Sequence, residues 1–340
     1  MKKLIALLLL ITLAFSAVSC AKQPENGDET DSTPIRIGYM QGPTGMGMAK
    51  LIHDNGGISG NEKYKFEKFG DVKEATAALL SGKIDMACLP TNNAAAIYNT
   101  QNEAVKVLAI NCLNSLYIMT KTGTEIDVLE DLSGKTIYTI ANGTPKAILE
   151  YVIDELDLNI HIETSATING QEKTLTQPSD LASAMIAGTV DVALVPEPVA
   201  TAAPLKIASQ EKDFTYTVAF DMTDIWEQIA EYPVAMGCIV ANRSFVEEHK
   251  TVTDSFLDEY KSSIEFMSKQ ENADTAAAYI VEATVLDAAP AAKKSLANLG
   301  DAISYIDGIE MKATLGDFYN AIDVSLIGGR LPDDDFYYEK

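Results

Sequence analysis

Small polar residues that can form hydrogen bonds stand at the positions of this sequence that could form a binding or catalytic site. They follow the apolar segments 35–40, 86–90, 135–140 and 192–196, and each group precedes a helix-like stretch. A loop that opens a helix leaves backbone N–H groups free, and these groups with the helix dipole hold an anion or a hydrogen-bond acceptor. The pattern predicts recognition of a small molecule without reaction. The candidate ligand-binding residues in these loops are Gly42, Pro43, Thr44, Gly45, Met46, Thr91, Asn92, Asn93, Asn142, Gly143, Thr144 and Glu197.

Each of these loops has a structural alternative. Residues 42–46 form either a binding loop or a plain capped turn, and we favour binding because residues 142–144 would face them across a cleft. One residue of 91–93 is expected to cap its own helix, which leaves two to reach a ligand. Glu197, which stands between two prolines, could accept a hydrogen bond from a ligand amine or ring N–H. The alternative for Glu197 is an exposed acid at a helix start.

Catalysis and metal binding lack their sequence signatures. The histidines at 53, 161 and 249 show no paired metal-ligand spacing, so we expect no metal and place them on the surface. No G-x-S-x-G elbow occurs, and GPTGMG at 42–47 departs from the G-x-G-x-x-G spacing of a dinucleotide site. The acids at 333–335 lack the spaced loop of a calcium site and are expected on a solvated face. We therefore predict no enzyme and no cofactor.

A duplicated segment indicates which elements position the loops. SGKIDMACLP at 81–90 returns as AGTVDVALVP at 187–196, an offset of 106 residues. Gly82 and Gly188 are predicted to end helices in the left-handed conformation, and a buried strand follows each. Upstream, segments 35–40 and 135–140 form a second pair, leading to helices expected from about Met46 and about Lys146.

Each half therefore runs strand, loop, helix, strand, helix, strand, loop, helix. Such alternation predicts an α/β fold in which mostly parallel sheets are flanked by helices. In two lobes of this kind, the loops at the carboxyl ends of the strands surround a shared cleft, where open α/β sheets bind ligands.

The N-terminus predicts export. Lys2 and Lys3 precede an apolar run from 4 to 18 that ends in small residues and Cys20, so residues 1–19 are interpreted as a cleaved signal peptide. A cysteine at this position resembles a bacterial lipobox, although Ala17 stands where leucine is usual. We expect a lipid on Cys20 and a flexible, acid-rich tether over residues 20–33.

Composition restricts the partners. The chain has 340 residues, of which 47% are hydrophobic, and a formal net charge of −23, which argues against nucleic acid and against broad binding to anionic membranes. Beyond Cys20, the odd number of cysteines in apolar segments indicates buried free thiols rather than disulfides. We expect a monomer.

The sequence resembles a known family. VLEDLSGKTI at 128–137 is similar to the "DLKGK" segment that opens the second lobe of type II periplasmic binding proteins, and the Gly-x-x-Asp-x-Ala repeats are typical of that fold. The sequence segments GPTGMG, LPTN, VPEP and GGRLPDDDFYY resemble segments of ABC importer binding proteins of the NMT1/THI5-like, or nitrate/sulfonate/taurine-type, group. The resemblance covers residues from about 35 to 335.

The resemblance implies two lobes that close on a ligand and are then recognised by an ABC permease and its ATPase. It implies one lobe from residues 34–112 and 237–340, a second from 113–236, and two hinge crossings. Asn111, Asn114 and Ser115 would lie near the first crossing and Met236 near the second, with hinge or pocket-floor roles. The tyrosines could stack on a planar ligand or pack in the core; they are Tyr39, Tyr98 and Tyr117.

The ligand class and the function retain alternatives. The only arginines are Arg36, Arg243 and Arg330, and none lies in a predicted cleft loop, so we expect a neutral or cationic planar heterocycle such as a pyrimidine rather than nitrate or a sulfonate. The same fold resembles cytoplasmic enzymes, of the THI5 type and of the futalosine pathway, whereas this chain carries an export signal. A ligand-presenting extracytoplasmic sensor is the remaining alternative.

Overall fold

The computed structural model describes residues 33–141 and 143–340, which alternate strands and helices. The predicted signal peptide, Cys20, nearly all of the tether and Asn142 lie outside the described residues. In the described part of the chain no helix combines the length and the hydropathy that a membrane span needs.

The first lobe is built on a five-stranded sheet of order β2-β1-β3-β12-β4. Strands β2, β1 and β3 pair in parallel, and β12 runs antiparallel between β3 and β4. The strands are β1 (Ile35–Tyr39), β2 (Tyr64–Lys68), β3 (Met86–Pro90), β4 (Val105–Leu113) and β12 (Ala235–Asn242).

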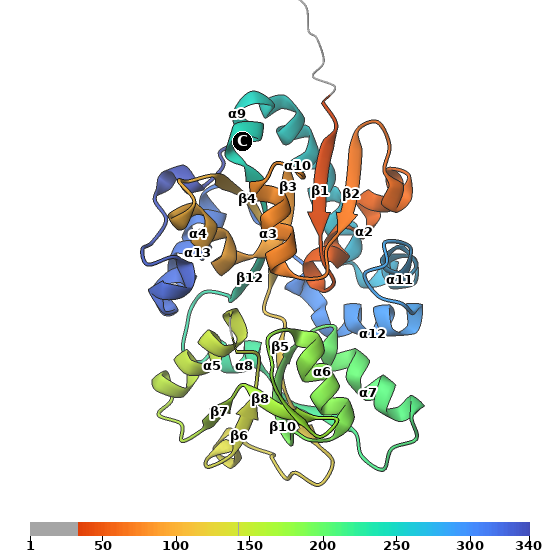
Figure 1. Ribbon diagram of the computed structural model, residues 1–340, viewed down its shortest axis with the longest axis vertical. Helices are drawn as coiled ribbons and strands as arrows, with labels where there is room; N and C mark the ends of the chain where they lie inside the picture. Colours follow the sequence, from red (N-terminus) through yellow and green to blue (C-terminus); the bar gives the residue numbers. More distant parts are fainter. Residues whose placement is uncertain (1–32, 142) are drawn as a thin grey trace, which may run out of the picture. The chain divides into compact units, whose positions relative to one another are not determined.

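Helices cover both faces of this sheet, so its central strand β3, MACLP, is a continuous apolar run (Figure 1). Met86 and Cys88 of β3 face one helical layer, and Ala87 and Leu89 face the other. The first layer holds α2 (Pro43–Asp54), α9 (Arg243–Glu248), α10 (Lys250–Met267), α11 (Ala273–Glu282) and α12 (Ala289–Leu299). The second holds α3 (Val72–Leu80), α4 (Thr91–Thr100) and α13 (Gly308–Ala321).

The second lobe repeats this plan with the strand order β11-β5-β10-β6-β7. Here β5 is the reversed strand, antiparallel to β11 and β10, while β10, β6 and β7 pair in parallel. The strands are β5 (Leu116–Lys121), β6 (Thr136–Tyr138), β7 (His161–Glu163), β10 (Val192–Pro196) and β11 (Tyr216–Asp221). Helices α5 (Thr144–Glu155) and α8 (Met222–Trp226) cover one face, and α6 (Pro178–Ala187) and α7 (Val199–Ser209) cover the other. The predicted fold class is confirmed.

The duplication also holds, with one addition and one correction. The hairpin of β8 (Ser165–Ile168) and β9 (Gln171–Thr174) interrupts the second copy. The predicted helix starts near Met46 and Lys146 are wrong, because α2 begins at Pro43 and α5 at Thr144. Proline supplies the helical φ in the first turn and needs no hydrogen-bond donor there, so each helix begins directly after its glycine.

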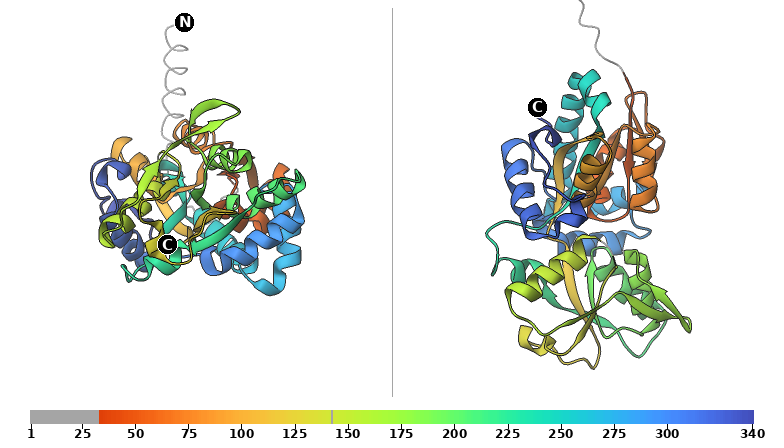
Figure 2. Two further views of the ribbon diagram at one scale, coloured as in Figure 1. Left: turned by 90° about the horizontal axis from the view of Figure 1, so that it is seen from below. Right: turned by 60° about the vertical axis from the view of Figure 1, so that its left-hand side comes forward.

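The chain passes between the two sheets twice (Figure 2). Residues 114–115 join β4 to β5, and residues 227–234 lead from α8 to β12. The two crossings are tied together by Asn114, whose backbone N–H donates to the Val234 carbonyl at 3.0 Å while its Oδ1 accepts from Val234 N at 2.8 Å.

Candidate ligand-binding site

Loops from the two lobes meet at the carboxyl ends of the strands, in a crossed arrangement. A Cβ atom on Gly42, after β1, would lie 3.9 Å from the Glu197 carbonyl oxygen, after β10. The Thr144 hydroxyl, after β6, donates to Asn92 Oδ1, after β3, at 3.0 Å. Thr144 therefore faces residues 91–93. Our sequence interpretation, which placed residues 142–144 opposite residues 42–46, is wrong for Thr144. An approximate two-fold relation between the lobes brings the first loop of one copy onto the second loop of the other.

The four helices that begin at these loops lack the usual N-terminal caps. Their N-cap residues are Gly42, Pro90, Gly143 and Pro198, none makes a side-chain capping bond, and no first turn holds an acid. Away from the loops, by contrast, Asp71 caps α3 and Asp221 caps α8. The N-termini of α2, α4 and α5 thus carry no anionic side chain that would compete with a ligand, whereas the Glu197 carboxylate accepts from Thr201 in the first turn of α7.

The capping role expected within residues 91–93 is therefore wrong, since Pro90 takes the N-cap position. The Thr91 hydroxyl donates instead to the Ala235 carbonyl of β12, and the Asn93 side chain accepts from Thr76 at 3.1 Å. Asn92 is the member of this group that reaches the other lobe.

Asn111 lies beneath the α2 N-terminus and is fully buried. Its Nδ2 donates to the Tyr260 hydroxyl at 2.9 Å, while its Oδ1 has no hydrogen-bond partner in the described part of the chain. A Cβ atom on Gly237 would lie 2.8 Å from this Oδ1 and 2.3 Å from Thr44 Cγ2. The absent side chain at Gly237 thus lets the Asn111 amide and Thr44 approach each other at the floor of the site.

Glu197 is only 1% exposed, and its carboxylate is already engaged. Oε1 accepts from the Thr201 hydroxyl at 2.8 Å and from Asn298 Nδ2 at 2.7 Å, and Oε2 accepts from the Ser295 hydroxyl at 3.0 Å. Burial raises the pKa of Glu197 above its ordinary value, and these three donors oppose the rise. Sequence reasoning missed Ser295 and Asn298, because nothing in their neighbourhood marks α12 as facing the other lobe.

The remaining predicted residues divide between the loops and the core. Tyr39 is 1% exposed and its hydroxyl donates to the Ala283 carbonyl at 2.9 Å, so its ring packs in the first lobe. Pro43, Gly45 and Met46 are buried in the first turn of α2, and Met236 is half-buried at the start of β12. Trp226 lies in the core, and the free thiols are buried, as expected; the thiols are Cys88, Cys112 and Cys238.

The cationic side chains of Lys146 and of the three arginines are already paired with acids. Lys146, in the first turn of α5, contacts Glu150. Arg36 forms a two-point contact with Asp85, and Arg243 and Arg330 pair with acids close to the C-terminus. Among the described residues, no group of His, Cys, Asp and Glu side chains is arranged to hold a metal ion.

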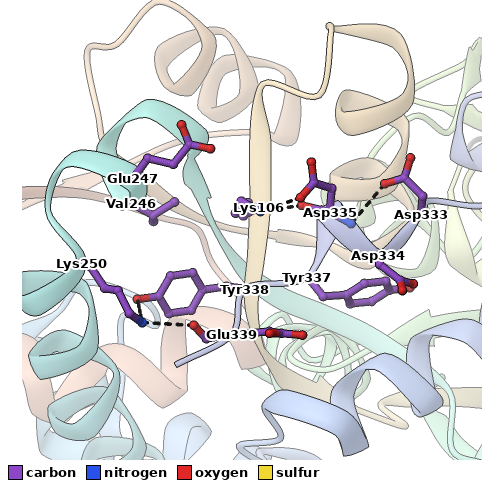
Figure 3. A pocket seen from close by; sticks show the side chains of 10 residues that line it. All are labelled: Lys106, Val246, Glu247, Lys250, Asp333, Asp334, Asp335, Tyr337, Tyr338 and Glu339. Carbon is purple, nitrogen blue, oxygen red and sulfur yellow. Dashed lines mark hydrogen bonds and ion pairs between the residues drawn. The ribbon is translucent and has the colours of Figure 1, made fainter.

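A surface pocket of about 720 Å³ lies where β4 begins, at the end of the first sheet opposite to the candidate loops (Figure 3). Its lining combines the acids at 333–335 with Lys106, Lys250 and the rings of Tyr337 and Tyr338. The Lys250 ammonium donates to the Tyr338 hydroxyl at 3.3 Å and to the Glu339 carbonyl at 3.1 Å. The charged and polar groups of the pocket bond to one another, and the pocket lies away from the inter-lobe loops. It is therefore not our candidate site.

Comparison with known proteins yields one family match. The model of the family described as "NMT1/THI5 like" matches residues 63–273. No curated protein matches the chain.

Solved structures of similar fold include transport proteins. An ABC transporter structure from Parabacteroides distasonis aligns with a TM-score of 0.71 at 20% identity, covering 91% of this chain and 99% of the other. The aliphatic sulphonate binding protein SsuA from Escherichia coli aligns with a TM-score of 0.62 at 18% identity, covering 88% and 93%. The nitrate-binding protein NrtA from Synechocystis PCC 6803 aligns with a TM-score of 0.57 at 14% identity, covering 83% and 75%.

Proposed function

Because the chain belongs to the NMT1/THI5-like family, we propose that it is the extracytoplasmic solute-binding component of an ABC importer. The observation that carries this proposal is the meeting of helix N-termini from two lobes, three of them without a side-chain cap or a first-turn acid, with Thr144 and Asn92 in contact across them. Such a site binds a small molecule by hydrogen bonds and offers no nucleophile. The chain captures its ligand and passes it to a permease and its ATPase without altering it.

We further propose residues 34–112 and 237–340 as one moving body and 113–236 as the other. Closure of the two bodies assembles the loops around the ligand, and the closed form is what the permease recognises. The lipid on Cys20 keeps this monomeric protein on the extracytoplasmic side of the cell membrane, at the periplasmic side or the outer face. Cys20→Ser should move the protein from the membrane fraction to the soluble fraction and abolish incorporation of labelled fatty acid; retention on the membrane would contradict the anchor.

The ligand that we favour is a neutral or cationic planar heterocycle. Helix N-termini and the Asn111 amide supply donors and an acceptor for ring carbonyl and N–H groups. Sulfonates and nitrate, the ligands in the names of two similar proteins, commonly bind to arginine forks, and the arginines here are paired with acids elsewhere.

A thermal-shift screen against pyrimidines, vitamins, sulfonates, nitrate, amino acids and polyamines tests the ligand class. A ligand at about a thousand times its dissociation constant adds roughly 4 kcal/mol to the folded state, which raises the melting temperature by several degrees. We expect saturable shifts with heterocycles. Thr144→Val should weaken them, while Ser183→Ala, on an exposed position of α6, should not. Shifts with sulfonates but not heterocycles would overturn the ligand class and leave transport standing.

A further inference from the structure

Five polar side chains, four of them buried and one, that of Asn298, on an exposed residue, connect the two lobes outside the ligand loops, and we call them the inter-lobe cluster. The second lobe contributes Tyr117, Glu197 and Thr201, and helix α12 of the first lobe contributes Ser295 and Asn298. None of the first four is more than 5% exposed. The cluster brings together groups up to 181 residues apart in the sequence.

The hydrogen bonds of the cluster link its five residues to one another. The Glu197 carboxylate accepts from one residue of its own lobe, Thr201, and from Ser295 and Asn298 of the other. Asn298 Nδ2 also donates to the Thr201 hydroxyl at 2.9 Å. The Tyr117 hydroxyl donates to the backbone carbonyl of Asn298 at 2.9 Å, and burial raises the pKa of Tyr117 so that this hydroxyl keeps its proton. Four hydrogen bonds therefore cross between the lobes.

The two sides of the cluster belong to separate hydrophobic cores. Ala292, Leu296 and Leu299 of α12 pack with β1 and α2 in the first lobe. Tyr117 packs with α6 and α7 in the second lobe. A rotation that separated the lobes would therefore carry Ser295 and Asn298 away from Glu197.

Separation of the lobes would remove two of the three side-chain donors of a buried carboxylate. A buried charge that loses its hydrogen bonds is strongly penalised unless water replaces them. With the cluster intact, the carboxylate is satisfied in the arrangement in which Thr144 and Asn92 are in contact. Its donors leave little room for a ligand amine, so we assign Glu197 to lobe contact instead of ligand contact.

We propose that Ser295 and Asn298 are positioning residues that hold the two lobes together through Glu197, so that the binding loops are already close before a ligand arrives. If only part of the population has its loops in this arrangement, the apparent dissociation constant rises by the inverse of that fraction. The residues on α12 therefore set affinity without touching the ligand. This inference rests on the contact between the lobes and does not depend on which ligand is bound.

The test measures the distance between the lobes without ligand. Spin labels are attached to Lys73→Cys on α3 and Lys206→Cys on α7, both exposed positions, in the full chain carrying Cys20→Ser. The other native thiols are buried, and burial raises the pKa of Cys88 and of Cys112 to about 12, which keeps them unreactive toward the label. Pulsed electron–electron double resonance then gives the distribution of distances between the two labels.

Ser295→Ala/Asn298→Ala should shift the distribution to longer distances. Ser263→Ala is the matched control, because Ser263 is also buried but bonds only to Gly47 and Leu51 of its own lobe. Circular dichroism establishes that each variant is folded. An unchanged distribution in the folded double variant would overturn the proposal.

A charge exchange separates positioning from general stability. Glu197→Gln should lengthen the distance, because a neutral amide oxygen accepts more weakly than the carboxylate from Asn298 and the second carboxylate oxygen, which accepts from Ser295, is lost. Glu197→Gln/Asn298→Asp returns a carboxylate–amide pair with its direction reversed and should return the distribution to that of the unmodified protein. Failure of the exchange to shorten the distance in a folded variant would contradict the assigned pairing of Glu197 with Asn298.

Discussion

At the scale of single residues, the buried carboxyl group of Glu197 makes stability depend on pH. Its pKa is raised above the ordinary 4.5 by burial, against the effect of its three donors. Below the ordinary pKa, the folded and unfolded states both hold the proton, and its contribution to stability is fully present. That contribution is lost as the pH rises through the raised pKa, because the unfolded state releases the proton more easily.

Glu197→Gln removes this titration. The free energy of unfolding of the unmodified protein, relative to that of the variant, is expected to fall as the pH is raised above 4.5. Chemical denaturation at a series of pH values measures the difference. A difference that grows with pH would mean that the donors outweigh burial and that the pKa is lowered.

Gly237 is the residue at which the packing of the site floor is most sensitive to size. An added Cβ would lie 2.3 Å from Thr44 Cγ2 and 2.8 Å from Asn111 Oδ1. We expect Gly237→Ala to lower the free energy of unfolding by about 1–3 kcal/mol through overpacking. Gly316→Ala is the control, since a Cβ at this helical position meets nothing within 4 Å and should stabilise by about 0.5–1 kcal/mol. Equal effects in denaturant melts would contradict the close approach at Gly237.

At the scale of elements, the repeated glycines differ in what surrounds them. Gly82 and Gly188 both adopt the left-handed conformation that the sequence predicts, with φ of 69° and 75°. A Cβ on Gly82 would meet nothing within 4 Å, whereas one on Gly188 would lie 2.7 Å from the Phe214 ring. Gly82→Ala should cost about 1 kcal/mol from backbone strain alone. Gly188→Ala should cost more, and thermal denaturation that ranked them in the opposite order would contradict this packing.

The elements were predictable because their signals are local. Buried strands, glycine helix ends and the order of strands and helices follow from patterns within about ten residues, and the duplication repeats them. The starts of α2 and α5 were misplaced because the prolines after Gly42 and Gly143 were assigned to loops, when they open the first turn. The capping role of residues 91–93 failed for a related reason, since Pro90 had already taken the N-cap position.

At the scale of the whole molecule, the contacts between lobes were the least predictable feature. The crossed pairing of loops depends on how two lobes meet, and no local pattern carries that information. Glu197 was singled out for its place after a strand, yet its partners Ser295 and Asn298 come from a helix about 100 residues later. The apolar pattern of α12 fixes which face packs on its own lobe but not what meets the opposite face.

The two crossings between the lobes give the last prediction. Asn114 joins them through two hydrogen bonds with Val234, which is 3% exposed. Asn114→Ala leaves the Val234 N–H without its side-chain acceptor, so we expect a loss of about 1–3 kcal/mol in the free energy of unfolding. Hydrogen exchange at Val234 should accelerate more than in the strands of either sheet, because the crossings are released while both cores remain packed. Asn320→Ala, on an exposed position of α13, is the control with little expected effect. Uniform acceleration throughout both sheets would show instead that the crossings and the two cores unfold as one unit.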